Sequence, residues 1–197
     1  MAKQTEMSVN MIDKLPGILT FLREAEQLKS TLRTAWTSSG RHESTAEHTW
    51  RLCLLAMLVG EHYPHLDMLK VLKLCIVHDL AEAVSGDISA LEQHDGLDKS
   101  ALELADLKQL IAPLDASMQQ ELLDLWLEYD SATTEEARLT KALDKLETIL
   151  QHTQGDNPVD FNYAFNLEYG KKHTDFDDLT KALRAIIDED TRRLAER

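Results

Sequence analysis

A single stretch decides the fold: residues 71–84 read VLKLCIVHDLAEAV and are apolar almost all round a helix. A helix with apolar residues on every side is buried in the centre of a protein. Burying an ionised carboxylate is costly unless the charge is paired or bound to a metal. We therefore expect a central helix over about 67–86, whose acidic residues need a compensating charge.

Three polar residues of this stretch share one side of the helix, because Glu82 lies three and four positions beyond Asp79 and His78. Two interpretations remain open. One is a buried salt-bridge network that includes Arg33 or Arg41. The other is a metal site, for which imidazole and carboxylate groups favour a divalent ion such as Mn²⁺, Co²⁺, Fe²⁺ or Zn²⁺ over Ca²⁺.

Two further residues are candidates for the same site. His48 follows Glu47 at the start of the preceding helix and is the natural second imidazole, although such a histidine is more often a helix-start or core residue. Asp144 is a weaker candidate, because it points away from the apolar stripe of its helix. That stripe consists of Leu139, Ala142, Leu143, Leu146, Ile149 and Leu150. Periodicity alone predicts that Asp144 is exposed.

The rest of the chain also repeats apolar residues at helical spacing, and no strictly alternating run requires a strand. We predict an all-α fold that forms a single globular domain over 1–197. Its core covers about 30–155, residues 30–43 are irregular and polar, and the C-terminal helix packs on the core. The predicted helices are 11–28, 44–62, 67–86, 99–111, 117–128, 134–154 and 178–194.

The net charge of −14 argues against binding to long nucleic acids or to anionic membrane surfaces. A small phosphorylated substrate remains compatible with this charge, since a metal and one or two arginines can reverse the local potential. The first ten residues lack signal-peptide features, and both cysteines lie in apolar helical runs. We therefore expect a cytoplasmic protein with reduced thiols and no membrane partner.

Several ordered blocks give the chain a family resemblance that covers most of its length. They are Arg33-Thr34-Ala35-Trp36, Arg41-His42-Glu43-Ser44-Thr45-Ala46-Glu47-His48, His78-Asp79-Leu80-Ala81-Glu82, Gly86-Asp87-Ile88, Leu125-Trp126-Leu127-Glu128-Tyr129, Glu136-Ala137 and Leu143-Asp144-Lys145-Leu146-Glu147. In these residues the chain resembles the HD-domain hydrolases, and among them the branch of 5′-deoxynucleotidases found in bacteria and eukaryotes.

The resemblance implies a complete site. It implies that one divalent ion (Mn, Co, Fe, Zn or Mg) is bound by four residues, which are His48, His78, Asp79 and Asp144. It gives Glu82 a role in catalysis or in binding a second ion, with Asp87 close by. Arg33 and Trp36 are implied to contact the nucleotide, and Arg41 and Ile88 of the matching blocks are expected substrate contacts. For Trp36, ordinary core packing is the alternative.

The expected function is hydrolysis of a phosphomonoester, most simply the 5′-phosphate of a (deoxy)nucleoside monophosphate. Glu82 would handle protons, because a carboxyl group desolvated in an apolar helix has a raised pKa. Arg33 would offset the charge of the transferring phosphoryl group. The alternatives are another HD-type phosphoesterase, acting on an alarmone or a cyclic nucleotide, and a catalytically idle, metal-binding regulatory protein. A homodimer is compatible with the apolar content.

Overall fold

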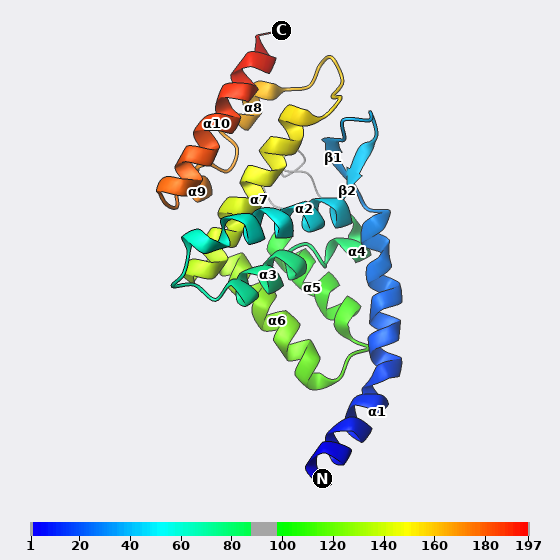
Figure 1. Ribbon diagram of the computed structural model, residues 1–197. Coiled ribbons are helices and arrows are strands. Elements are labelled where there is room, and N and C mark those ends of the chain that lie inside the picture. The colour runs from blue at the N-terminus through cyan, green and yellow to red at the C-terminus, as the bar shows by residue number, and fades with distance from the viewer. Residues whose placement is uncertain (1, 88–97, 197) are drawn as a thin grey trace.

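The computed structural model describes residues 2–87 and 98–196 and is built almost entirely of helices (Figure 1). The α-helices are α1 (Ala2–Ala25), α2 (Thr45–Val59), α3 (Met68–Val77), α4 (Glu82–Ser85), α5 (Lys99–Ile111), α6 (Ala116–Ser131), α7 (Glu135–Gln154), α8 (Tyr163–Asn166), α9 (Lys171–Thr174) and α10 (Asp178–Ala195). Short 3₁₀ turns follow α1 and α2, at Glu26–Lys29 and Gly60–His62. The predicted all-α class is confirmed.

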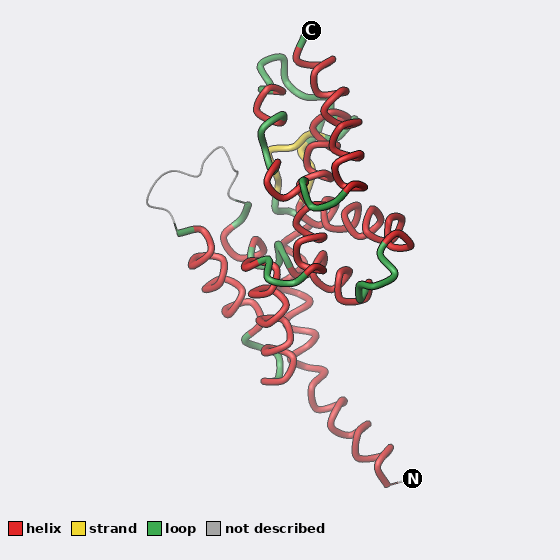
Figure 2. The backbone as a smooth tube through the Cα atoms, turned by 90° about the vertical axis from the view of Figure 1, so that its left-hand side faces the viewer, coloured by secondary structure: helices red, strands yellow, loops and turns green. Residues whose placement is uncertain are grey.

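The core is centred on α7, which packs against α2, α3, α6, α10 and β1. Its apolar side chains meet those of α2 and α3 in one buried cluster, whereas α5 and α6 close a second cluster beneath α3. The first half of α1 projects away from this body (Figure 1, Figure 2). None of the described helices combines the length and the apolar character needed to cross a membrane. The surroundings of α7 make it the helix on which a buried site can be assembled.

The prediction of an irregular segment over 30–43 is wrong in one respect, because this segment contains an antiparallel hairpin. Strand β1 (Leu32–Trp36) pairs with β2 (His42–Ser44), and Gly40 in the connection has a φ of 77°, which favours glycine. Of the two inward positions of β1, one is taken by the buried Ala35 and the other by the charged Arg33, so the apolar alternation that normally identifies a strand is missing. The hairpin lies against α7, where the Gln151 side chain donates to the Trp36 carbonyl at 2.6 Å.

The predicted central helix over 67–86 is interrupted in its middle. Helix α3 ends at Val77, and the next residues form tighter turns in which the Leu80 and Glu82 amides donate to the Val77 and Asp79 carbonyls, each at 3.1 Å. Such 3₁₀ turns place residues three apart on the same side. Asp79 and Glu82 therefore still face one site, and the helical segment ends at Gly86, with a φ of 88°, as predicted.

Candidate metal centre

The four predicted ligands come together at the junction of three helices. His48 lies in the first turn of α2, whose start is fixed by a capping box between Ser44 and Glu47. His78 and Asp79 occupy the tight turn after α3, and Asp144 lies in the middle of α7. Sequence positions almost a hundred residues apart thus contribute to one cluster.

Short distances separate the side chains of this cluster. His48 Nε2 lies 3.3 Å from Asp144 Oδ1 and 3.8 Å from Asp79 Oδ2. His78 Nε2 lies 3.0 Å from Asp79 Oδ2 and 4.0 Å from Asp144 Oδ1. The Nε2 atoms of both histidines and the carboxylates of Asp79 and Asp144 therefore point at one small volume.

Each histidine is oriented through its other ring nitrogen. His78 Nδ1 lies 2.8 Å from the Cys75 carbonyl, which can only accept, so this nitrogen must carry the proton. His48 Nδ1 contacts the Glu147 carboxylate, which in turn accepts from Arg51 Nε at 2.5 Å. With Nδ1 as the donor, each Nε2 presents a lone pair. Both Nε2 atoms are buried, and neither has a hydrogen-bond partner among the described residues.

The donor set fits a divalent metal ion. One atom from each of His48, His78 and Asp144 lies within 4.8 Å of the others, and all three residues are buried. Two neutral imidazoles with carboxylate oxygens are ligands that ions such as Mn²⁺, Fe²⁺, Co²⁺ and Zn²⁺ accept. Buried polar atoms are rarely left without partners, and an ion would satisfy both Nε2 atoms at once. The cluster can therefore hold a divalent cation.

Asp144 is only 4% exposed, so the exposure predicted from periodicity is wrong. The reason is that α7 is surrounded by other helices well beyond its apolar stripe. Burial opposes ionisation of Asp144, but Lys145 Nζ, 2.9 Å from Oδ2, and the two histidines hold its pKa well below the usual range. Tyr129 also donates to Oδ2 at 2.7 Å, which leaves Oδ1 facing the histidines.

Glu82 lies beside the cluster. Its pKa is raised, whereas that of Asp144 is lowered. Its Oε2 accepts from Thr45 Oγ1 at 2.8 Å, and the side chain is buried. Burial, together with the charges of Asp79 and Asp87, raises the pKa of Glu82 to about 9. A carboxyl group in this state holds a proton near neutral pH and can donate it.

The cluster opens into a cavity of roughly 1140 Å³ that is also lined by Glu82, Asp87, Arg33 and Trp36. Arg33 Nη1 lies 3.4 Å from Asp79 Oδ2, and its Nη2 donates to Thr148 Oγ1 at 3.2 Å. The salt-bridge interpretation is thus partly realised, but the Arg33–Asp79 pair does not itself involve the Nε2 atom of either histidine. Trp36 is half-buried on the cavity wall, so its ring is available to a ligand as well as to packing.

Two predicted substrate residues are not in the described wall of the cavity. Arg41 is exposed and makes a two-bond contact with Glu47, at 2.9 and 2.5 Å. Ile88 lies outside the described residues. Substrate contacts by Arg41 and Ile88 stay predictions.

Sequence reasoning missed the far wall of the cavity. His152, Phe161, Phe165 and Asn166 line one end, and His152 packs edge-on against Phe161 with ring centroids 5.1 Å apart. Its position eight residues after Asp144, on the same face of α7, was the available signal. The residues of α8 gave none, because only tertiary packing brings them to the cavity.

Glu147 was also given no role from the sequence, although the structure places it behind His48. We expect Glu147→Gln to weaken metal binding about 10- to 100-fold, the usual effect of losing a carboxylate that orients a ligating histidine. Titration of metal-stripped protein with Mn²⁺ or Zn²⁺ measures this change. Glu128→Gln is the matched control, because Glu128 pairs with Lys70 at 2.6 Å, away from the cavity. Equal metal affinity of Glu147→Gln and wild type would contradict the role.

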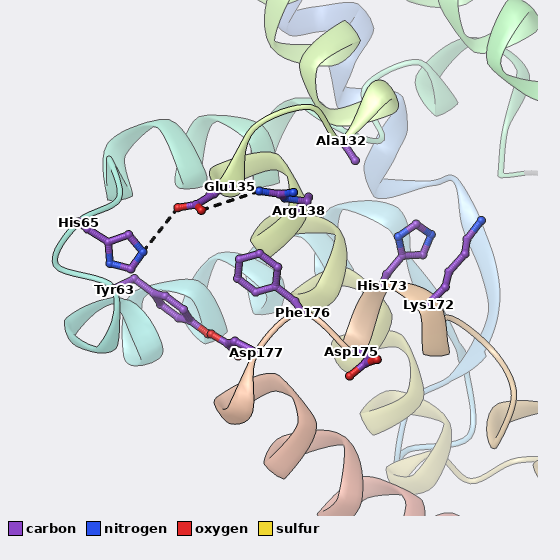
Figure 3. Close-up of a pocket in the computed structure, with 10 residues that line it drawn as sticks. All are labelled: Tyr63, His65, Ala132, Glu135, Arg138, Lys172, His173, Asp175, Phe176 and Asp177. Carbon is purple, nitrogen blue, oxygen red and sulfur yellow. Dashed lines mark ion pairs between the residues drawn. The ribbon is translucent and has the colours of Figure 1, made fainter.

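A second hollow, of about 620 Å³, opens next to the first (Figure 3). Glu135 lies in it, paired with His65 at 3.7 Å and with Arg138 at 3.8 Å. It shares Lys172 and His173 with the larger cavity. These two residues of α9 therefore stand on the boundary between the hollows.

Comparisons with known proteins show what the chain is similar to. Residues 25–184 match the protein family described as HD domain. The 5′-deoxynucleotidase hdd1 of Schizosaccharomyces pombe is 38% identical over 141 residues, which are 68% of this chain and 70% of that protein. The 5′-deoxynucleotidase HDDC2 of Xenopus laevis is 31% identical over 187 residues, covering 91% and 90% of the two chains. The crystal structure of a predicted metal-dependent phosphohydrolase from Magnetospirillum magnetotacticum MS-1 superposes with a TM-score of 0.75 at 29% identity, covering 91% of this chain and 94% of that one.

Proposed function

Because this chain belongs to the HD-domain family and is a metal-dependent phosphohydrolase, we propose that it removes the 5′-phosphate from deoxynucleoside monophosphates. We further propose that four side chains hold one divalent ion, namely His48, His78, Asp79 and Asp144. The substrate class is the one named for its relatives from Schizosaccharomyces pombe and Xenopus laevis.

One observation carries the proposal: two buried imidazole nitrogens without hydrogen-bond partners among the described residues converge with two carboxylates at the floor of a cavity. A salt-bridge network could satisfy these nitrogens only with both rings protonated, because they face carboxylate oxygens, which can only accept. A divalent ion bound there supplies Lewis-acid stabilisation of phosphoryl charge and activation of the attacking water.

The residues around the cluster then have separate tasks. Arg33, held by Asp79 and Thr148, presents its guanidinium to a phosphoryl group and offsets the charge that develops on it. Glu82, which holds a proton near neutral pH, can donate to the leaving 5′-oxygen of the nucleoside. Asp87 helps to keep that proton in place through its charge.

The nucleoside has an apolar place to lie. Trp36 and Phe161 supply aromatic faces on which a sugar or base can pack, and His152, eight residues beyond Asp144 on α7, packs against Phe161. Asn166 adds a buried amide nitrogen without a hydrogen-bond partner among the described residues, which is suited to a carbonyl on a base. These contacts support a nucleotide over a simple sugar phosphate.

The experiment that tests the proposal is release of inorganic phosphate by metal-stripped protein from ribo- and deoxynucleoside 5′-monophosphates, with Mn²⁺, Co²⁺, Mg²⁺ or Zn²⁺ added back. We expect release only with metal, and faster release from deoxy than from ribo substrates. Cyclic nucleotides and pyrophosphoryl esters are included as competitors. A preference for either of these classes would replace the proposed substrate by that of another HD-type phosphoesterase, and a bound ion without any turnover would indicate a regulatory protein.

A further inference from the structure

One face of α7 supplies several residues that line the cavity. Lys141, Asp144, Thr148 and His152 follow each other at spacings of three or four residues, so they lie on the same side of the helix and all line the cavity. At 1.5 Å per residue, Lys141 lies about 5 Å before Asp144 along the axis, and His152 about 12 Å beyond it. The metal centre therefore has cavity on both sides, and the nucleoside of the proposed substrate occupies only the side of His152.

The other side carries three lysines, and Asp130 lines the cavity beside one of them, Lys141. Lys141, Lys145, Lys172 and His173 line it, and Figure 3 shows Lys172 and His173 next to each other on α9. Lys145 Nζ contacts Asp144 and lies 5.4 Å from the centre of the Tyr169 ring. We call these four residues the lysine end of the cavity.

The two outer lysines of the lysine end lack carboxylate partners. Lys141 donates to the Asp130 carbonyl at 2.7 Å and lies 4.9 Å from the centre of the Tyr129 ring. Neither Lys141 nor Lys172 forms an ion pair with a carboxylate in the part of the chain that the structure describes. Their positive charges are therefore available to a ligand.

The positive charges of the lysines in the lysine end repel one another. Burial, and the proximity of Lys145 and Lys172, lower the pKa of Lys141, although Asp130 and Asp144 act in the opposite direction. Burial and the three lysines lower the pKa of His173 to about 4, so its imidazole is neutral at pH 7. Like charges gathered in a cavity of a protein with a net charge of −14 are best explained by an anionic ligand.

We propose that Lys141, Lys145 and Lys172 form a subsite for a second phosphate group, so that the cavity also binds nucleoside 5′-diphosphates. The α-phosphate then lies at the metal centre, the nucleoside toward His152, and the β-phosphate among the lysines. This inference rests on the proposed function, which fixes the direction of the nucleoside. A single phosphate held at the metal centre beside Arg33 leaves the outer lysines unused, whereas a diphosphate reaches them.

The test compares the binding of 2′-deoxyadenosine 5′-diphosphate and 5′-monophosphate by calorimetry, at a buffered free concentration of Mn²⁺. The full-length, metal-loaded chain carries Glu82→Gln, so that the monophosphate is not consumed. We expect the diphosphate to bind roughly tenfold more tightly, the effect of about one charge-assisted hydrogen bond. Adding Lys172→Gln should remove most of this preference. Lys108→Gln makes the same charge change on the exposed face of α5 and should keep the preference.

Two results would overturn the subsite. One is equal affinity for the two nucleotides in the protein that retains Lys172. The other is a Lys172→Gln protein that loses affinity for both alike, because the lysines would then hold the phosphate next to the metal. Hydrolysis of the monophosphate by wild type is followed separately. A diphosphate preference that depends on Lys172, in a protein without such hydrolysis, would support the subsite and refute the proposed function.

Discussion

Asp79→Asn is expected to lose the divalent ion and, with it, all phosphatase activity. Asp79 Oδ2 lies 3.0 Å from His78 Nε2 and 3.8 Å from His48 Nε2, so this carboxylate faces both histidines of the proposed site. Removing its charge takes away a proposed direct ligand, and we expect metal affinity to fall by more than the roughly 100-fold upper effect of an indirect partner. The metal content of purified protein and titration of the metal-stripped form measure the change.

The control for Asp79→Asn must remove the same charge from the same cavity. Asp130 lines the cavity and accepts from Ser100 at 2.8 Å, but it does not contact either histidine of the site. We expect Asp130→Asn to keep its metal. Circular dichroism separates loss of metal from loss of fold. A folded Asp79→Asn protein with wild-type metal content would remove Asp79 from the ligand set.

Glu82→Ala is expected to give the opposite combination, with the metal retained and turnover lost. Glu82 is bonded to Thr45 and holds its proton near neutral pH, which fits a proton donor beside the ion more than a ligand. Loss of a general acid or base typically slows an enzyme roughly 10²- to 10⁴-fold. The rate of phosphate release, measured with the metal content of the same sample, tests both parts.

Two further variants isolate proton transfer from packing. Glu82→Gln keeps an oxygen for the Thr45 hydroxyl and should lose as much activity as Glu82→Ala. Glu103→Gln changes another carboxyl group on the cavity wall, one paired with Lys99 at 3.1 Å, and should stay within a few-fold of wild type. An active Glu82→Gln enzyme would remove the proton-transfer role from Glu82.

The helical content could be predicted from the sequence because apolar spacing and caps are local signals. The Ser44 capping box and the closing glycine at Gly86 lie where the pattern places them. The hairpin could not be predicted in this way, since the charged Arg33 occupies one of the two inward positions of β1 and β2 has only three residues. The break after Val77 was hidden as well, because the stretch remains apolar on both sides of it.

In the candidate site, too, some residues could be predicted from local sequence patterns and others could not. From the residues alone, spacing placed His78, Asp79 and Glu82 on one side of a helix and offered His48 only as a candidate second imidazole. Asp144 required the family resemblance, because its burial depends on the helices packed around α7 and periodicity registers only one stripe.

By itself, the sequence therefore determined the all-α class and the set of residues that meet at the centre, because both depend on patterns within single helices and on ordered motifs. Tertiary structure alone decided what surrounds that centre. It placed Glu147 behind His48 and turned α8 and α9 toward the cavity. These relations join segments far apart in the chain, and no local pattern of residues encodes a contact of that kind.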